Sequence, residues 1–188
     1  MLKVKLFFFV IIFTSVICGV FGIFHDQITY TISREYFTRF KFVQFGLTDG
    51  YDSPLEMSNR IGAIIVGILA TWWVGIPIGI MYSTILMFFK EQSHLYKIYF
   101  RTIALTFTIT ILTSFAGYLN WKFYLQYAPE PDWYYPDNLI DKSSFICVGC
   151  IHNFSYLGGL IGLMAGTFYL LIHKGKEKKS IRSLNISK

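Results

Sequence analysis

The sequence predicts an all-α membrane protein, a four-transmembrane-helix bundle in one domain (1–188) with a partly ordered cap on the outer side. Hydrophobic residues make up 54% of the chain and charged residues only 15%, whereas a soluble domain carries about 25% charged residues. Four apolar stretches reach roughly the 20 residues that a helix needs to cross a bilayer. Lysine and arginine concentrate in alternate connecting segments. Together these observations favour a multi-pass protein over a soluble one.

The four predicted transmembrane helices cover residues 6–24, 61–89, 102–119 and 151–172. Helices are the expected form, because lipid offers no partner to an unpaired backbone group. The first stretch follows Lys3 and Lys5 and also has the pattern of a signal peptide. Because Val20-Phe21-Gly22 is a poor cleavage site, we expect an uncleaved signal anchor.

The charges predict that both termini are cytoplasmic. With the link 90–101 and the tail 173–188 inside, the inner segments hold 11 of the 17 basic residues and only two acids. The outer loops 25–60 and 120–150 hold the other 9 acids. This asymmetry follows the positive-inside rule. We interpret the basic tail as a topology determinant near anionic lipid and expect no nucleic-acid partner.

Glycine, proline and threonine predict how the helices pack. Pro77, between Gly75 and Gly79, predicts a kink in the second helix, and we expect Trp72 and Trp73 to face the bundle. The third helix has one small or hydroxyl-bearing face: Thr102, Thr106, Thr110, Thr113 and Gly117. The fourth has a glycine ridge: Gly158, Gly162 and Gly166. Such a ridge serves internal packing or a homo-oligomer.

The first outer loop contains two local patterns. Ile28, Tyr30 and Ile32 alternate with threonines, which is typical of a strand. Ser33 then has the position of a helix N-cap, and Gly46 that of a helix stop. The basic and aromatic segment between them either lies on the outer membrane surface or packs as a lid on the bundle end.

Two stretches carry a resemblance. His25 to Phe42 (HDQITYTISREYFTRFKF) and His152 to Leu163 (HNFSYLGGLIGL) resemble a group of small multi-pass bacterial membrane proteins that has no assigned activity. Arg34 departs from that group, in which proline is expected at this position. The resemblance implies a multi-pass protein of the bacterial cytoplasmic (inner) membrane.

Cys147 and Cys150 form a CxxC pair at the outer start of the fourth helix, a position that suits disulfide exchange. This placement resembles vitamin K epoxide reductase and its bacterial relatives. The resemblance implies a quinone-coupled thiol–disulfide oxidoreductase in which these two cysteines are the redox pair. That family has a second cysteine pair in the first outer loop, which this chain lacks. A structural disulfide and two incidental thiols are the alternatives.

Four polar residues near the outer helix ends form the predicted ligand site: His25, Asp26, Glu35 and His152. With Cys147 or Cys150, the histidines are also candidate ligands for zinc or copper, and two histidines could hold a haem. The plainer alternative is that the histidines cap helices. No GxGxxG, P-loop, GxSxG or HExxH motif occurs. The leading hypothesis is therefore an accessory or ligand-binding membrane protein with a polar site on the outer face; whether it is also an enzyme and which cofactor it binds are left open.

Overall fold

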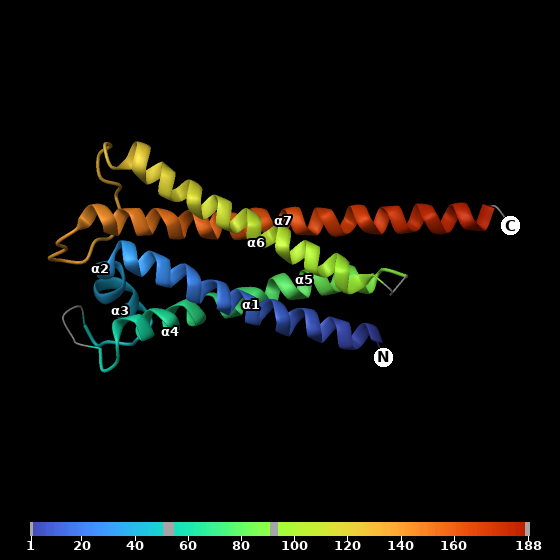
Figure 1. The fold of residues 1–188 in the computed structure, drawn as a ribbon, viewed down its shortest axis with the longest axis horizontal. Coiled ribbons are helices and arrows are strands. Elements are labelled where there is room, and N and C mark those ends of the chain that lie inside the picture. The colour runs from blue at the N-terminus through green and yellow to red at the C-terminus, as the bar shows by residue number, and fades with distance from the viewer. Residues whose placement is uncertain (1, 51–54, 91–93, 187–188) are drawn as a thin grey trace.

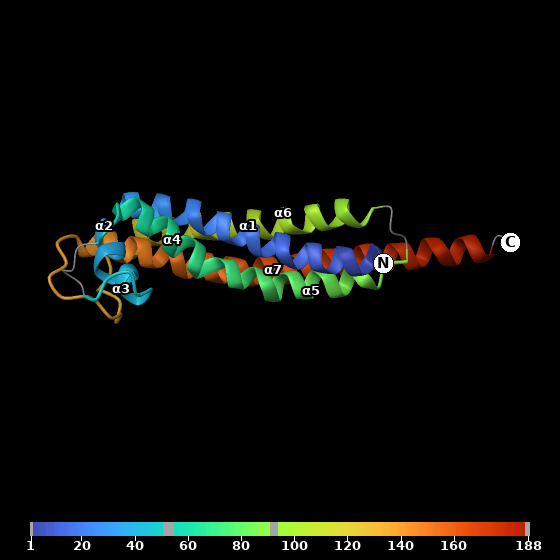
Figure 2. The ribbon, with the colours of Figure 1, turned by 90° about the horizontal axis from the view of Figure 1, so that it is seen from below.

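The computed structural model describes residues 2–50, 55–90 and 94–186, and within these ranges the chain is helical, without strands. Four helical segments are long and apolar enough to cross a membrane: Lys3–Ile32, Asn59–Met87, Leu95–Leu125 and Lys142–Lys178. They lie along one axis, and both ends of the described chain are at the end of the bundle opposite residues 33–46 (Figures 1 and 2). The four predicted transmembrane helices are therefore confirmed as helices of suitable length and composition.

Several predicted helix ends are wrong. Helix α1 (Leu2–Ile32) continues eight residues past Phe24, so the strand-like alternation lies in a helix. The backbone groups of this stretch bond within α1, and the hydroxyls of Thr29 and Thr31 donate to carbonyls one turn back in the same helix. Helix α7 (Lys142–Ile186) begins well before Ile151, and helix α6 (Leu95–Asn120) begins well before Thr102. Asp26, expected in a loop, is therefore part of a transmembrane-length helix.

The second span is broken, as Pro77 predicts. Helix α4 (Asn59–Thr71) is followed by a 3₁₀ turn (Trp72–Val74) and helix α5 (Gly75–Met87). Proline has no amide hydrogen, so the carbonyl one turn earlier, that of Trp73, loses its helical partner. Trp72 and Trp73 are 45% and 54% exposed, so the expectation that they face the bundle is wrong.

Helix α1 packs closely along the broken span. A Cβ added to Gly67 would lie 2.4 Å from the carbonyl oxygen of Gly22, and one added to Gly75 would lie 2.4 Å from the Cα of Ser15. The two backbones touch at these points, so no larger side chain fits. Gly75, expected only to flank the kink, thus also packs against the backbone of α1.

Helices α6 and α7 form the other half of the bundle (Figure 1). Added Cβ atoms at Gly158 and Gly162 would meet Thr113 and Thr106 of α6, and one at Gly166 would meet the Tyr82 hydroxyl. The glycine ridge therefore packs inside the chain, which is one of its two expected roles. Oligomer formation itself remains a prediction, without an assigned surface.

Residues 33–46 form a lid over one end of the bundle, which we call the cap end. The lid contains α2 (Arg34–Tyr36), a π-helical turn (Phe37–Lys41) and α3 (Phe42–Gln44). Ser33 Oγ accepts from Tyr36 N at 3.3 Å, and Gly46 ends the lid with a φ of 68°, so both predicted signals are confirmed. The buried rings of the lid pack on Ala63, Val66, Phe145 and Val148. Of the two alternatives for this basic and aromatic segment, the membrane surface or a lid, the structure shows a lid packed on the bundle end.

Candidate functional site

His25, Asp26 and His152 meet beneath the lid, between α1 and α7. His25 Nδ1 lies 3.1 Å from Asp26 Oδ1, and His152 Nε2 lies 3.3 Å from the same oxygen. One nitrogen or oxygen of each side chain lies within 4.8 Å of the others. Residues that are 126 positions apart in sequence therefore form one cluster. This convergence was expected for both histidines and Asp26.

The helix around His152 determines which nitrogen faces the aspartate. His152 Nδ1 lies 3.0 Å from the carbonyl oxygen of Val148, one turn earlier in α7. A carbonyl can only accept, so Nδ1 carries the hydrogen. In a neutral imidazole Nε2 then has a lone pair, which points at the acceptor oxygen of Asp26. Two acceptors at 3.3 Å repel unless a proton or a metal ion joins them.

Two further polar atoms of the cluster are buried without a hydrogen-bond partner. They are His25 Nε2 and Asp26 Oδ2. Leaving such an atom unpaired costs about 1–3 kcal/mol, and more when the group is charged. Buried unpaired polar atoms in one cluster indicate a place where a ligand or ion completes the bonding.

Aromatic rings close the cluster from several sides. The Tyr36 ring of the lid lies 5.0 Å from the His152 ring at 31°, and the His25 ring meets His152 edge-on at 4.6 Å. The Tyr156 ring lies 6.4 Å from His152, one turn further along α7. Asp26 and His152 are each only 4% exposed. Such a dry setting strengthens every electrostatic interaction inside it.

Lys41 is the buried cation of the lid. Its Nζ lies 5.5–5.9 Å from the ring centroids of Tyr36, Phe40 and Phe45. Burial lowers the pKa of the Lys41 ammonium, and the charge of Asp26 acts in the opposite direction. The lid therefore adds positive charge near the carboxylate without a direct ion pair among the described contacts.

Glu35 is not part of the cluster, although it was predicted to be. Its carboxylate accepts hydrogen bonds from the backbone of Ile140 and Asp141 at 2.7–3.1 Å, and it pairs with Arg39 at 3.4 Å. Glu35 thus ties the lid to the chain that leads into α7. Glu35 directly precedes Tyr36, and successive side chains of a helix point about 100° apart, so the Glu35 carboxylate faces away from the histidines that the Tyr36 ring covers.

Cys147 and Cys150 lie in the second and third turns of α7 and are both buried. All three cysteines of the chain are free thiols in the structure. The Sγ of Cys150 lies 4.0 Å from Asn120 Nδ2, on the α6 side of the helix. Neither cysteine belongs to the group of described residues that could share a metal ion. The metal-ligand candidates are therefore reduced to His25, Asp26 and His152.

A haem does not fit between the two histidines. Bis-histidine ligation places the imidazoles on opposite faces of the porphyrin plane. Here the two rings touch edge to face at 4.6 Å, which leaves no room for a macrocycle between them. A single small cation is the better match to this geometry.

Comparison of the chain with known protein families, with curated proteins and with solved structures finds no match. The cluster is therefore interpreted from its own geometry.

Proposed function

We propose that this chain is a transition-metal-binding protein of the bacterial cytoplasmic membrane, with both termini inside and the cap end outside. His25, Asp26 and His152 are the proposed ligands, and zinc is the simplest ion for them. The distribution of basic residues supports the orientation, and four apolar helices support multi-pass insertion. The resemblance to small bacterial membrane proteins supports the location.

The observation that carries this proposal is the convergence of one ligand atom from each of His25, Asp26 and His152 within 4.8 Å, with His152 Nδ1 bonded to the Val148 carbonyl. Metal-binding histidines almost always donate their second ring N–H to a carbonyl, carboxylate or water in this way. The bond directs the Nε2 lone pair at Asp26. Two tetrahedral ligands about 2.1 Å from zinc lie about 3.4 Å apart, close to the observed 3.3 Å between Nε2 and Oδ1.

The two imidazoles and the carboxylate of the cluster also suit zinc. Neutral imidazole and carboxylate bind zinc, and three protein ligands leave a fourth position open to water or another molecule. Thiolates, which favour copper(I) and iron–sulfur clusters, lie outside the cluster. The surrounding rings exclude bulk water, so that a bound ion would sit in a low-dielectric site.

The direct test is metal analysis of the protein purified with a tag that contains no histidine. We expect about one zinc ion per chain, as a completed three-residue site requires, and loss of that ion in His152→Ala. His173→Ala is a matched control, because His173 is on the same helix and its Nδ1 also bonds the carbonyl one turn earlier, at 3.0 Å.

Cobalt substitution gives a second readout. Cobalt bound in a tetrahedral site absorbs in the visible range, and we expect this band in the wild type and in His173→Ala but not in His152→Ala. If purified wild type contains no metal and gives no cobalt band, the metal proposal is wrong. The cluster would then be a polar link between α1 and α7.

A further inference from the structure

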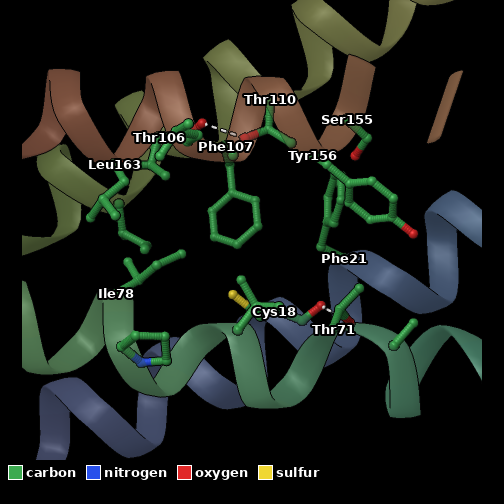
Figure 3. A pocket seen from close by; sticks show the side chains of 16 residues that line it. Cys18, Phe21, Thr71, Ile78, Thr106, Phe107, Thr110, Ser155, Tyr156 and Leu163 are labelled. Carbon is green, nitrogen blue, oxygen red and sulfur yellow. Dashed lines mark hydrogen bonds between the residues drawn. The ribbon is translucent and has the colours of Figure 1, made fainter. Parts of the chain in front are cut away.

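The side of the cluster that faces the middle of the bundle is closed by aromatic rings. A central cavity of about 310 Å³ lies there, lined by all four spans, and its lining includes none of His25, Asp26 and His152. Phe21 and Tyr156 stand together at one end of this cavity (Figure 3). The Phe21 ring lies 5.6 Å from the His25 ring, and the Tyr156 ring lies 6.4 Å from the His152 ring. These two rings therefore separate the cluster from the cavity.

The lateral side of the cluster is apolar. His25 borders a groove of about 460 Å³ between α1 and α6, whose lining consists mostly of hydrocarbon side chains such as Ile28 and Phe115. A metal ion does not cross such a surface readily, because the transfer of a charge into an apolar medium is strongly unfavourable. The side covered by the lid, residues 33–46, is therefore the route left for an ion to reach or leave the cluster.

Lys41 stands on this lid side of the cluster. The residue is only 5% exposed, and its Nζ lies 5.5–5.9 Å from the ring centroids of Tyr36, Phe40 and Phe45. The Tyr36 ring also lies 5.0 Å from the His152 ring. The Lys41 ammonium and the His152 ring are therefore at most about 11 Å apart, the sum of their two distances from the Tyr36 centroid.

The surroundings of Lys41 keep its ammonium charged. Burial lowers the pKa of Lys41 and the charge of Asp26 raises it, while the faces of three aromatic rings attract the cation. Within the described ranges 2–50, 55–90 and 94–186, Lys41 Nζ forms no hydrogen bond or salt bridge. Glu35, the acid of the lid, is paired with Arg39. Asp26 is therefore the carboxylate that balances the charge of Lys41 in the metal-free chain.

We infer that Lys41 makes the cluster an exchangeable metal site, in which the cation of the closed lid opposes the bound ion. This inference rests on the metal site proposed above. A zinc ion brings two positive charges and takes the Asp26 carboxylate as a ligand, so Lys41 then faces like charge. Buried charges at this distance are only weakly screened by water and salt. The closed lid therefore lowers the affinity for the ion and favours its release, as a carrier or a sensor requires.

The effect is reciprocal. If the charge of Lys41 weakens zinc binding, bound zinc weakens the closed position of Lys41 by the same factor. Glu35 still holds the start of the lid through the backbone of Asp141. We therefore expect zinc to loosen the part of the lid around Lys41, residues 37–44, while the start of the lid stays attached.

The test is the zinc affinity of Lys41→Met, measured on the full solubilised chain by competition with a chromogenic chelator. Methionine keeps the contacts with the aromatic rings and carries no charge. We expect Kd for zinc to fall by about 10- to 100-fold, as a divalent ion and a unit charge about 11 Å apart predict at an effective dielectric constant of about 20 or more. Lys41→Arg keeps the charge and should keep Kd near that of the wild type.

Lys122→Met is the matched control. Lys122 Nζ also lies over two rings, those of Tyr118 and Phe123, at 5.9 and 5.8 Å, but the residue is exposed in the turn that follows α6. We expect its Kd to equal that of the wild type. An unchanged or higher Kd in Lys41→Met would overturn the inference, because loss of a lysine with only a packing role weakens zinc binding or leaves it unchanged.

Hydrogen exchange of the wild type tests the same inference without a variant, and it decides the matter if Lys41→Met does not fold. We expect zinc to speed amide exchange in residues 37–44, and unchanged or slower exchange there would contradict the inference. The metal proposal fails separately. A wild type that binds no zinc refutes the site itself, whereas zinc binding that does not depend on the charge of Lys41 refutes only its regulation.

Discussion

Asp26→Asn tests the cluster most sharply, because it keeps the shape of the side chain and removes its charge. Asp26 Oδ1 lies within 3.3 Å of a nitrogen of each histidine, so this one change affects every contact in the cluster. Loss of a residue that only orients a ligand costs 10–100-fold in metal affinity. Loss of one of three ligands should cost at least the upper value. We therefore expect Kd for zinc to rise by about 100-fold or more, which is about 2.7 kcal/mol.

The assay is competition for zinc between the detergent-solubilised protein and a chromogenic chelator. Thr29→Val is the matched control, because the Thr29 hydroxyl donates only to the carbonyls of His25 and Asp26 within α1. We expect its Kd to stay near that of the wild type. An unchanged Kd in Asp26→Asn would mean that the carboxylate is not a ligand, and the reasoning from the 3.3 Å contact would be refuted.

Three further outcomes are expected. Tyr36→Ala opens the lid over His152 and should speed zinc release to a chelator by about tenfold, while loss of the buried ring lowers the free energy of unfolding by about 3 kcal/mol. Gly67→Ala should destabilise the bundle by about 1–3 kcal/mol in thermal unfolding, because its Cβ meets the backbone of α1. Gly159→Ala, with open surroundings, should not destabilise, and a loss equal to that of Gly67→Ala would contradict the packing argument. Asp141→Ala removes the side chain that accepts from the third residue of α7 at 2.9 Å and should cost about 1 kcal/mol. Because that hydrogen bond holds the pKa of Asp141 below its ordinary 3.8, its contribution is present above about pH 4 and is lost as the pH falls further, so wild type and variant should converge in acid.

Much of the fold follows from composition. Apolar length identified all four spans, Pro77 located the break to within one turn, and Ser33 and Gly46 marked the lid. The helix ends were harder, because Thr29 and Thr31 resemble a strand by period while their hydroxyls satisfy helix carbonyls. The alternation of threonine with apolar residues fits a strand or a helix. The hydrogen bond from each hydroxyl to the carbonyl four residues earlier is specific to the helix.

The site was predictable only in part. The predicted topology places His25 and His152 at the outer ends of two helices, and this alone predicts that they lie on one side. Their contact depends on how the bundle places α1 beside α7, with α1 held by glycine contacts to the broken span and α7 by glycine contacts to α6. Glu35 was assigned to the cluster from its position in the sequence. The turn of the lid instead directs the Glu35 carboxylate to the backbone of Ile140. The signal that was overlooked is Tyr36, an aromatic residue one step from Glu35 that covers His152.

Helix α7 is unbroken, so the number of residues between two of its positions fixes the distance between them. From His152 it rises about 37 Å, at 1.5 Å per residue, to Glu177, which accepts from the backbone of Lys90 at 2.8 Å. This distance exceeds the roughly 30 Å of a hydrocarbon core. A residue inserted between the two points would turn His152 by about 100° relative to Glu177. The number of residues in α7 therefore fixes both the distance and the rotation between the histidine cluster and Glu177 at the opposite end of the bundle.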